Sequence, residues 1–199
     1  MASLSDSALA AALAGHDAKS LSRTLIKFPD SGLMKLSLSQ SQPDVRKLDL
    51  SKNALADLRT ISAMPRLTFF KCADNELKAK GAKPCAALVE LTVLNLMRNK
   101  LSRVPPLAPL VRLKALVLTG NRLTDISAVA SLPSLEQLVV SRNRLETVPA
   151  TVLAALPRLK KLSASHNLLS EMPDCSKNPE LVELKLNSKT YVCFTYNRR

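Results

Sequence analysis

The chain has 199 residues, a formal net charge of +13 and a hydrophobic content of 46%. This apolar share argues against a disordered chain, and the low count of 4 glycines excludes a collagen-like or glycine-rich linker sequence. No stretch of about 18 uncharged apolar residues occurs, so we expect no membrane-spanning helix.

A short helix is predicted near the N-terminus. Ser5 and Asp6 both suit its N-cap position, and Gly15 follows its expected end. Two leucines of this segment are four residues apart, so their side chains lie on one face of the helix. We predict that residues 1–22 form an N-terminal cap; the alternative is a loosely ordered tail.

One pattern recurs through the rest of the chain: Leu, two variable residues, Leu, one variable residue, an apolar residue, two variable residues, Asn, one variable residue and Leu. The clearest copy is Leu91, Leu94, Leu96, Asn99 and Leu101. The second apolar position of the seven copies is occupied, in chain order, by Leu48, Phe70, Leu94, Leu116, Leu138, Leu162 and Leu184. Consecutive copies are therefore 22 or 24 residues apart.

Both ends of this array are degenerate. Ile26 lies one period before the first copy and indicates a weaker eighth copy. The last copy is eroded, with Lys189 in the asparagine slot and Tyr191 in the final leucine slot. We assign residues 23–191 to the repeat array and residues 192–199 to a minimal C-terminal cap or a truncated end.

Over residues 45–191 the pattern resembles the consensus of the leucine-rich repeat family. Its period is similar to that of the short, 22-residue intracellular class, which includes the leucine-rich regulatory subunit of protein phosphatase 1. The resemblance implies an α/β solenoid, a right-handed horseshoe or arc. Its concave side is expected to be a parallel sheet of seven or eight short strands, and its convex side to have 3₁₀ or extended segments. We expect an extra helical turn in the two longer copies, within 79–89 and 151–156.

One asparagine in each copy follows the predicted strand. The turn at this point leaves backbone N–H and C=O groups buried without a sheet partner, and an asparagine amide has both the acceptor and the donors that they need. We predict a structural ladder in which these side chains stack from coil to coil: Asn53, Asn75, Asn99, Asn121, Asn143 and Asn167.

No catalytic or metal-binding pattern occurs in the sequence. It has no glycine-rich phosphate loop and no HExxH motif, and His16 and His166 lack neighbours at metal-ligand spacing. The four cysteines lack paired CxxC spacing and occupy apolar slots, which favours reduced, buried thiols. We therefore expect a protein that is not an enzyme and has no catalytic residue, no metal and no cofactor.

Surface side chains are then expected to carry the function, because the inward ones are committed to packing. The alternation along each strand predicts which residues point outward. An apolar group lies in the middle of this concave face, and we call it the face patch: Phe69, Val93, Met97, Val117 and Val139. An exposed apolar group is typical of a partner site. The alternative is that β-branched residues are present only because they favour strands.

Basic residues lie just before and after the predicted asparagine ladder. We call this row the basic ridge: Lys52, Arg98, Lys100, Arg122, Arg142 and Arg144. Asp74 and Glu76 interrupt it. Such a ridge is suited to phosphates or to acidic side chains of a protein, with an affinity that falls as salt is raised. The alternative is a solvated rim.

The sequence favours a non-enzymatic protein–protein interaction scaffold that binds a partner on its concave face and has a basic rim. One alternative is a structural component of an RNA-containing assembly, with phosphate contacts through the basic ridge; a further alternative is a cytoskeletal or axonemal adaptor. The sequence has 2 Tyr, 4 Phe and no Trp, which argues against reading of bases by stacking. No basic residue precedes Lys19, the reverse of a secretory signal, so we expect an intracellular protein, cytoplasmic or nuclear, with no membrane partner.

Overall fold

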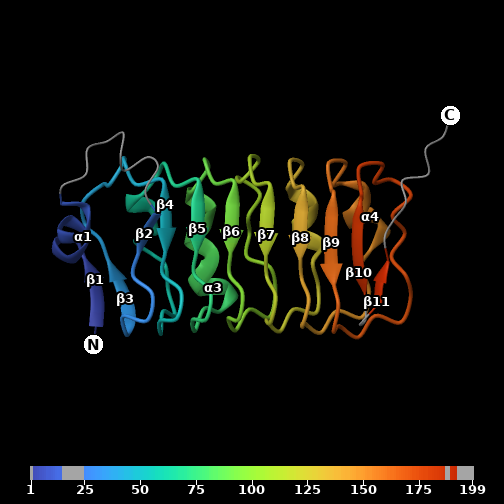
Figure 1. The fold of residues 1–199 in the computed structure, drawn as a ribbon, viewed down its shortest axis with the longest axis horizontal. Helices are drawn as coiled ribbons and strands as arrows, with labels where there is room; N and C mark the ends of the chain where they lie inside the picture. The colour runs from blue at the N-terminus through green and yellow to red at the C-terminus, as the bar shows by residue number, and fades with distance from the viewer. Residues whose placement is uncertain (1, 15–24, 187–188, 192–199) are drawn as a thin grey trace.

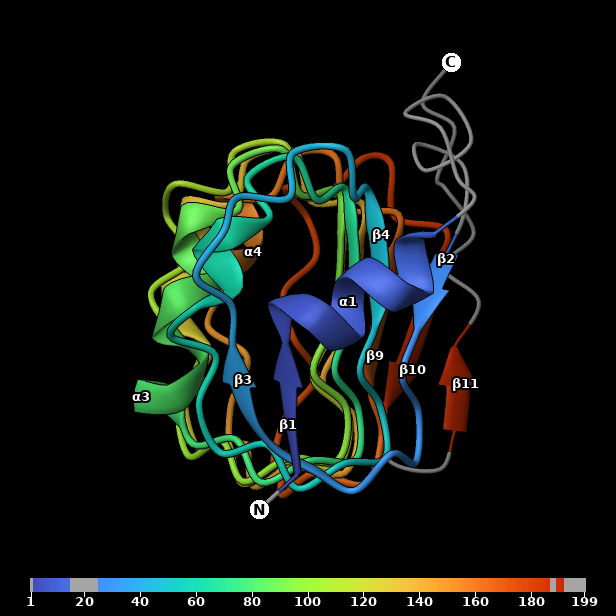
Figure 2. The ribbon, with the colours of Figure 1, turned by 90° about the vertical axis from the view of Figure 1, so that its left-hand side faces the viewer.

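The computed structural model describes residues 2–14, 25–186 and 189–191 of the chain. Its coils stack side by side in one row, with β1 and β11 at opposite ends of the row (Figure 1). Seen along the row, strands lie on one side, turns and short helices lie on the other, and buried apolar side chains form the core (Figure 2). The predicted α/β solenoid is therefore confirmed.

Nine strands form the main sheet, in the order β2-β4-β5-β6-β7-β8-β9-β10-β11. Their bounds are β2 Leu25–Lys27, β4 Lys47–Asp49, β5 Phe69–Lys71, β6 Val93–Asn95, β7 Ala115–Val117, β8 Gln137–Val139, β9 Lys161–Ala164, β10 Glu183–Leu186 and β11 Lys189–Tyr191. The strands from β2 to β10 pair in parallel, and each pair aligns equivalent repeat positions, such as Leu94 with Leu116. The pairing of β2 shows that the weak copy at Ile26 forms a coil.

The apolar slots of the repeat face inward. All four leucines of the clearest copy, Leu91, Leu94, Leu96 and Leu101, are 0% exposed. Burying one leucine side chain contributes about 1.5–3 kcal/mol relative to leaving it exposed, and each coil shares this packing with its neighbours. Because these positions are filled, only the side chains between them are left for binding.

The convex segments differ from coil to coil. Both longer copies contain helical turns, as predicted, and two of the shorter ones contain 3₁₀ turns. These elements are η1 Ile61–Ala63, α3 Ala79–Ala82, η2 Lys83–Ala87, η3 Ser127–Ser131 and α4 Ala150–Ala154. Gly81 allows α3 to approach the preceding coil closely, because a Cβ there would overlap the carbonyl oxygen of Ala56.

The first coil has a two-stranded sheet on its convex side, which the sequence pattern did not predict. β1 (Ala2–Ser5) pairs in parallel with β3 (Leu33–Ser37). β3 is thus an extended segment, as expected for this part of the coil, and its pairing with β1 is the unexpected feature. The extra pairing supplies hydrogen bonds to backbone groups that have no coil beyond them.

The predicted N-terminal helix is present as α1 (Asp6–Leu13). The Ser5 hydroxyl accepts the N–H of Ala8 at the N-cap, and Leu9 is 0% exposed within the core. In the end-on view α1 lies across the end of the stack (Figure 2). Gly15 lies outside the described residues, and the cap boundary at residue 22 stays a prediction.

The C-terminal end departs from the repeat. β11 runs antiparallel to β10, so that Lys189 pairs with Leu186 and Tyr191 with Leu184. The last, eroded copy, with Lys189 in the asparagine slot and Tyr191 in the final leucine slot, therefore does not continue as the other copies do. Lysine differs from asparagine in having no hydrogen-bond acceptor in its side chain.

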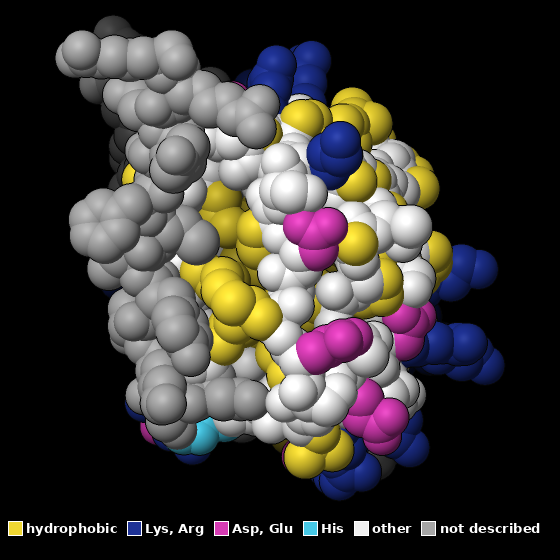
Figure 3. All heavy atoms as spheres, turned by 90° about the vertical axis from the view of Figure 1, so that its right-hand side faces the viewer, with side chains coloured by type: hydrophobic (Ala, Val, Ile, Leu, Met, Phe, Trp, Pro, Cys, Tyr) yellow, Lys and Arg dark blue, Asp and Glu magenta, His cyan; other side chains and the backbone are white. Residues whose placement is uncertain are grey.

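Hydrophobic side chains are exposed at this end of the stack, with acidic side chains among them (Figure 3). The most exposed are Leu168, Met172 and Val182, at 62%, 61% and 55%. The predicted segment 192–199 lies outside the described residues.

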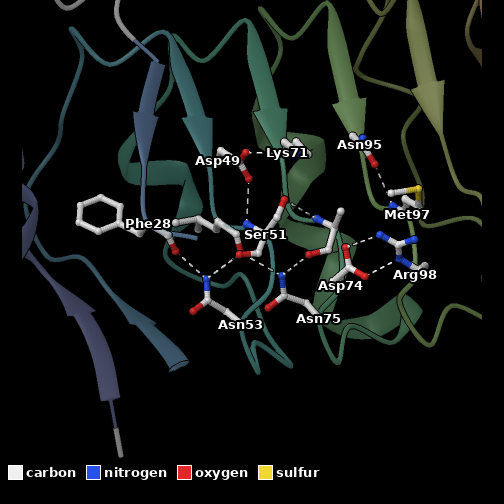
Figure 4. Close-up of polar contacts among 12 residues, drawn as sticks. Phe28, Asp49, Ser51, Asn53, Lys71, Asp74, Asn75, Asn95, Met97 and Arg98 are labelled. Atoms are coloured by element: carbon white, nitrogen blue, oxygen red, sulfur yellow. Dashed lines mark hydrogen bonds and ion pairs between the residues drawn. The ribbon is translucent and has the colours of Figure 1, made fainter. Parts of the chain in front are cut away.

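The predicted asparagines stack from coil to coil, and each bonds the backbone of the coil before it. Asn121 accepts the N–H of Leu101 at 3.0 Å and donates to the carbonyl oxygens of Leu96 at 3.0 Å and Leu118 at 2.9 Å. Equivalent bonds are made by Asn53, Asn75, Asn99, Asn143 and Asn167. Figure 4 shows Asn53 and Asn75 in neighbouring coils below the ends of their strands. Each side chain therefore ties two coils together.

Replacement of one ladder residue should destabilise the whole stack. We expect Asn121→Ala to lower the free energy of unfolding by about 3 kcal/mol, because it leaves a buried N–H and buried carbonyls without partners. Ser102→Ala, at an exposed position, should change it by less than about 0.5 kcal/mol. Urea unfolding followed by circular dichroism measures both, and equal midpoints for the two variants would contradict the assigned role.

Candidate protein-binding face

The outward side chains of the sheet form rows, because neighbouring strands pair in register. One row contains Phe69, Val93 and Ala115, and the next contains Asn95, Val117 and Val139. All of these side chains are half-buried, since each is flanked by others on strands about 4.8 Å away. The structure therefore brings four members of the face patch together on β5 to β8.

Met97, the fifth member of the face patch, lies in the turn after β6. Its N–H donates to the side-chain oxygen of Asn95 at 2.9 Å, which fixes the turn against the strand (Figure 4). Its side chain is half-buried, and a flexible thioether adapts its shape to a bound segment. The face patch thus extends from the strands to the edge of the sheet that carries the basic ridge, because the next residue, Arg98, belongs to that ridge.

Ion pairs border the face patch along the sheet. On β4 and β5, Lys71 Nζ lies 3.2 Å from Asp49 Oδ2. On β9 and β10, Glu183 pairs with Lys161 at 3.0 Å and with Lys185 at 2.7 Å. An apolar centre between charged borders has the organisation of a protein interface, with a hydrophobic core and a polar rim.

Asp49 is held in place by several donors. It is only 7% exposed. Burial raises the pKa of its carboxyl, but hydrogen bonds from the Ser51 hydroxyl and N–H, together with the Lys71 ammonium, outweigh burial and bring the pKa below its ordinary value of 3.8. The carboxylate is therefore ionised at neutral pH and anchors this border of the face patch (Figure 4).

In the turns that follow β2 and β4 to β9, the residue directly before the asparagine slot has a left-handed backbone. The φ values lie between 48° and 70° at Asp30, Lys52, Asp74, Arg98, Gly120, Arg142 and His166. This conformation costs a residue with a Cβ about 1–2 kcal/mol, which the surrounding bonds must offset. Half of the basic ridge stands at this position, so its side chains leave the coil from a fixed backbone.

Two members of the basic ridge are neutralised within the fold. Arg98 forms an ion pair with Asp74, in which Nη2 lies 3.1 Å from Oδ2 (Figure 4), and Lys100 forms one with Glu76. In both pairs the acid stands one coil before the base, at the same position of the repeat. The interruption of the ridge by acidic residues is therefore a local neutralisation.

The other members of the basic ridge are Lys52, Arg122, Arg142 and Arg144, and all are exposed. Within the described ranges, none of them forms an ion pair with an acidic side chain. Three of these four are arginines of two adjacent coils. The positive charge of the ridge is therefore concentrated beyond its neutralised part.

An open groove of about 560 Å³ runs along this edge of the solenoid. We call it the edge groove; it is lined by Asn53, Asp74, Asn75, Glu76, Arg98, Asn99, Lys100, Gly120, Asn121, Arg122 and Arg144. Sequence reasoning identified its cations but missed the groove itself. The available signal was Gly120, which stands where most other coils have a charged residue.

In the described part of the chain, no group of three or more His, Cys, Asp or Glu side chains is placed to hold a metal ion, and no helix has the length and apolarity to cross a membrane. His166 is exposed, and His16 lies outside the described residues.

Cys72 and Cys85 are fully buried in the core. Burial raises the pKa of the Cys85 thiol to about 12 and that of Cys72 well above 9.0. Cys175 is half-buried, and Cys193 lies outside the described residues. Since the thiolate is the reactive form, Cys72 and Cys85 serve as apolar packing residues.

The lowered pKa of Asp49 predicts a dependence of stability on pH. A carboxyl with a folded-state pKa below its unfolded value stabilises the fold above the unfolded pKa, and this contribution is lost as pH falls through the folded pKa. We therefore expect the stability difference between the wild type and Asp49→Asn to be largest near pH 7 and to shrink below pH 3.8. Urea titrations at several pH values measure it; a difference that stays constant with pH would overturn the prediction.

The two buried thiols should resist alkylation while the protein is folded. At pH 8 we expect iodoacetamide to leave Cys72 and Cys85 unmodified in buffer and to modify both in urea, because unfolding removes the burial that raises their pKa values. Peptide mass spectrometry reads each site separately. Equal modification rates in buffer and in urea would show that these thiols are accessible.

Comparison with known proteins agrees with the geometry. The Leucine rich repeat family model matches residues 89–145, 111–169 and 133–188, which together cover about half of the chain. No curated protein sequence gives a significant match.

Among solved structures, the internalin InlF of Listeria monocytogenes is similar with a TM-score of 0.64 and 26% identity, over 78% of this chain and 48% of that chain. A leucine-rich repeat protein of Leptospira interrogans is similar with a TM-score of 0.60 and 26% identity, over 78% of this chain and 49% of its own. The octameric complex of latrophilin 3, Unc5D and the leucine-rich repeat protein FLRT2 has a similar chain, with a TM-score of 0.63 and 25% identity over 82% of this chain and 57% of that one.

This chain spans about half the length of the two bacterial structures. The leucine-rich repeat fold is typical of protein–protein interaction scaffolds, and such proteins are generally non-enzymatic. The repeat register, the parallel sheet and the family match agree over the same coils: the chain belongs to the leucine rich repeat family.

Proposed function

We propose that this protein is a non-enzymatic scaffold that binds a protein partner on the outward face of its sheet, against the face patch. The observation that carries this proposal is a contiguous apolar group at the centre of a solvent-facing sheet, where polar side chains are normally found. Strand propensity explains a valine at one of these positions. It also explains Phe69 on β5, but not Met97 beside the valines, because Met97 is outside the strand.

The backbone beneath the face patch is already ordered. Parallel pairing on both sides fixes β5 to β8, and the asparagine ladder fixes the turns that follow them. A partner that docks here does not have to order these residues, so little of its binding free energy is lost to that cost. The half-buried side chains of the patch offer a shallow surface, which suits a helix or an extended segment.

The basic ridge borders the same face and supports selection of the partner by charge. Its exposed arginines accelerate association with a negatively charged partner and disfavour a positively charged one. This contribution weakens when salt shortens the range of the field. Assembly with RNA has the net charge of +13 in its favour, but the described residues that line the edge groove include no aromatic side chain to stack a base.

Charge placed in the centre of the face patch should abolish partner binding. We expect Val117→Asp combined with Val139→Asp to lose the proteins that the wild type captures from lysate, because each carboxylate must be desolvated against an apolar partner surface. Affinity purification with quantitative mass spectrometry, with and without nuclease, measures the captured set.

The matched control carries the same two changes at exposed valines outside the face patch. Val89→Asp combined with Val111→Asp replaces valines that are 51% and 53% exposed, and it should retain the captured proteins. Circular dichroism checks that both double variants are folded. An unchanged set of partners in the Val117 and Val139 variant, or loss of all partners on nuclease treatment of the wild type, would defeat the proposal.

A further inference from the structure

The ion pairs along the basic ridge follow a rule that connects one coil to the next. Asp74 pairs with Arg98, and Glu76 pairs with Lys100. The two acids are two residues apart and lie on either side of Asn75, and the two bases are related in the same way around Asn99. An acid-x-acid segment of one coil thus neutralises a base-x-base segment of the following coil.

The same rule is broken two coils further along. Arg142 and Arg144 lie on either side of Asn143, which is again a base-x-base segment. The preceding coil offers Gly120 and Arg122 at the positions that correspond to Asp74 and Glu76. Both carboxylates that the pattern requires are therefore missing, and one of them is replaced by another cation.

The two positions without carboxylates border the edge groove. Gly120, Arg122 and Arg144 line the edge groove. Gly120 has φ +70° in a column where the other residues carry side chains, and Arg98 packs against it, because a Cβ at Gly120 would lie 3.0 Å from Arg98 Cγ. The amides of Asn121 and Asn143 are already engaged with the backbone, which leaves the guanidinium groups as the binding groups of this region.

We propose that the edge groove binds an extended acidic segment of a protein partner, in which two carboxylates spaced i and i+2 take the places that Asp74 and Glu76 occupy for the neighbouring coil. The carboxylates pair with Arg122 and Arg144, which line the groove, and with Arg142, an exposed residue that is not part of the groove lining. An arginine guanidinium binds a carboxylate through two parallel hydrogen bonds, so the pair fixes the orientation of the carboxylate in addition to attracting its charge. Alternate side chains of an extended segment point the same way, so spacing i and i+2 is the one that such a groove selects.

The groove and the face patch are parts of one surface. Met97 belongs to the face patch, and the next residue, Arg98, lines the groove. This inference rests on the proposed function in one respect, namely that the acidic segment belongs to the protein held on the face patch. It defines that partner as one with an apolar contact region followed by an acid-x-acid sequence.

A peptide without apolar side chains tests the groove independently of the face patch. We expect a fluorescein-labelled octapeptide of alternating Glu and Gly to bind the full chain in an anisotropy titration, and the Gln–Gly octapeptide not to bind. Affinity should fall when NaCl is raised from about 50 to about 300 mM, because the pairs are exposed. Arg122→Gln combined with Arg144→Gln should weaken binding about five- to tenfold.

Two further variants make the result specific. Arg112→Gln combined with Arg158→Gln removes the same charge at exposed positions outside the groove and should change the affinity by less than about twofold. Gly120→Asp keeps every arginine but supplies an internal carboxylate. Aspartate already adopts this backbone at Asp30 and Asp74, and the Arg98 side chain shifts to admit the new Cβ, which would otherwise lie 3.0 Å from Arg98 Cγ. The variant should weaken peptide binding by competing for the arginines of the groove.

Several outcomes would overturn the proposal. They are absence of binding at low salt, equal losses for the groove and control arginine pairs, unchanged binding by Gly120→Asp, and tighter binding of an oligouridylate of eight nucleotides than of the acidic peptide. The last outcome would assign the groove to nucleic acid. Failure of the face-patch variants to lose partners, with peptide binding intact, would defeat the proposed function and leave the groove assignment standing.

Discussion

The turn after each strand buries backbone groups that have no partner in their own coil, and one asparagine per coil supplies those partners. Its oxygen accepts an N–H of the preceding coil and its nitrogen donates to carbonyls in both coils, as Asn121 does with Leu101, Leu96 and Leu118. An orphaned buried group costs about 1–3 kcal/mol, so the repeat depends on this residue at every step. Where Lys189 replaces it, the chain returns as an antiparallel strand.

Because of this constraint, the residues that pack the core differ from the residues that are free to bind a partner. Because the amides and the leucines are committed inward, the outward side chains vary without disturbing the fold. The chain uses that freedom unevenly: β4 and β10 carry charged side chains on the outer face, whereas β5 to β8 carry Phe69, Val93, Val117 and Val139. The apolar face patch therefore lies on a rigid sheet, with charged side chains on both sides of it.

Charge along the edge is organised by the same stacking. Equivalent positions of adjacent coils lie about 5 Å apart, so a carboxylate in one coil reaches a base in the next. Asp74 and Glu76 do this for Arg98 and Lys100, while Arg142 and Arg144 have no such acids before them. The net charge of +13 is thus not spread evenly along the ridge.

The sequence by itself determined the coil period, the inward leucines, the asparagine positions and the two longer coils that hold α3 and α4. Each of these depends on where a residue stands within its own repeat, and spacing along the chain records that. Only the tertiary structure decided that β1 pairs with β3, that β11 turns back on β10, and that Arg98 is neutralised while Arg144 is not. These outcomes depend on which side chains and backbone edges of different coils come within reach of one another, and that distance is set across the stack rather than along the chain.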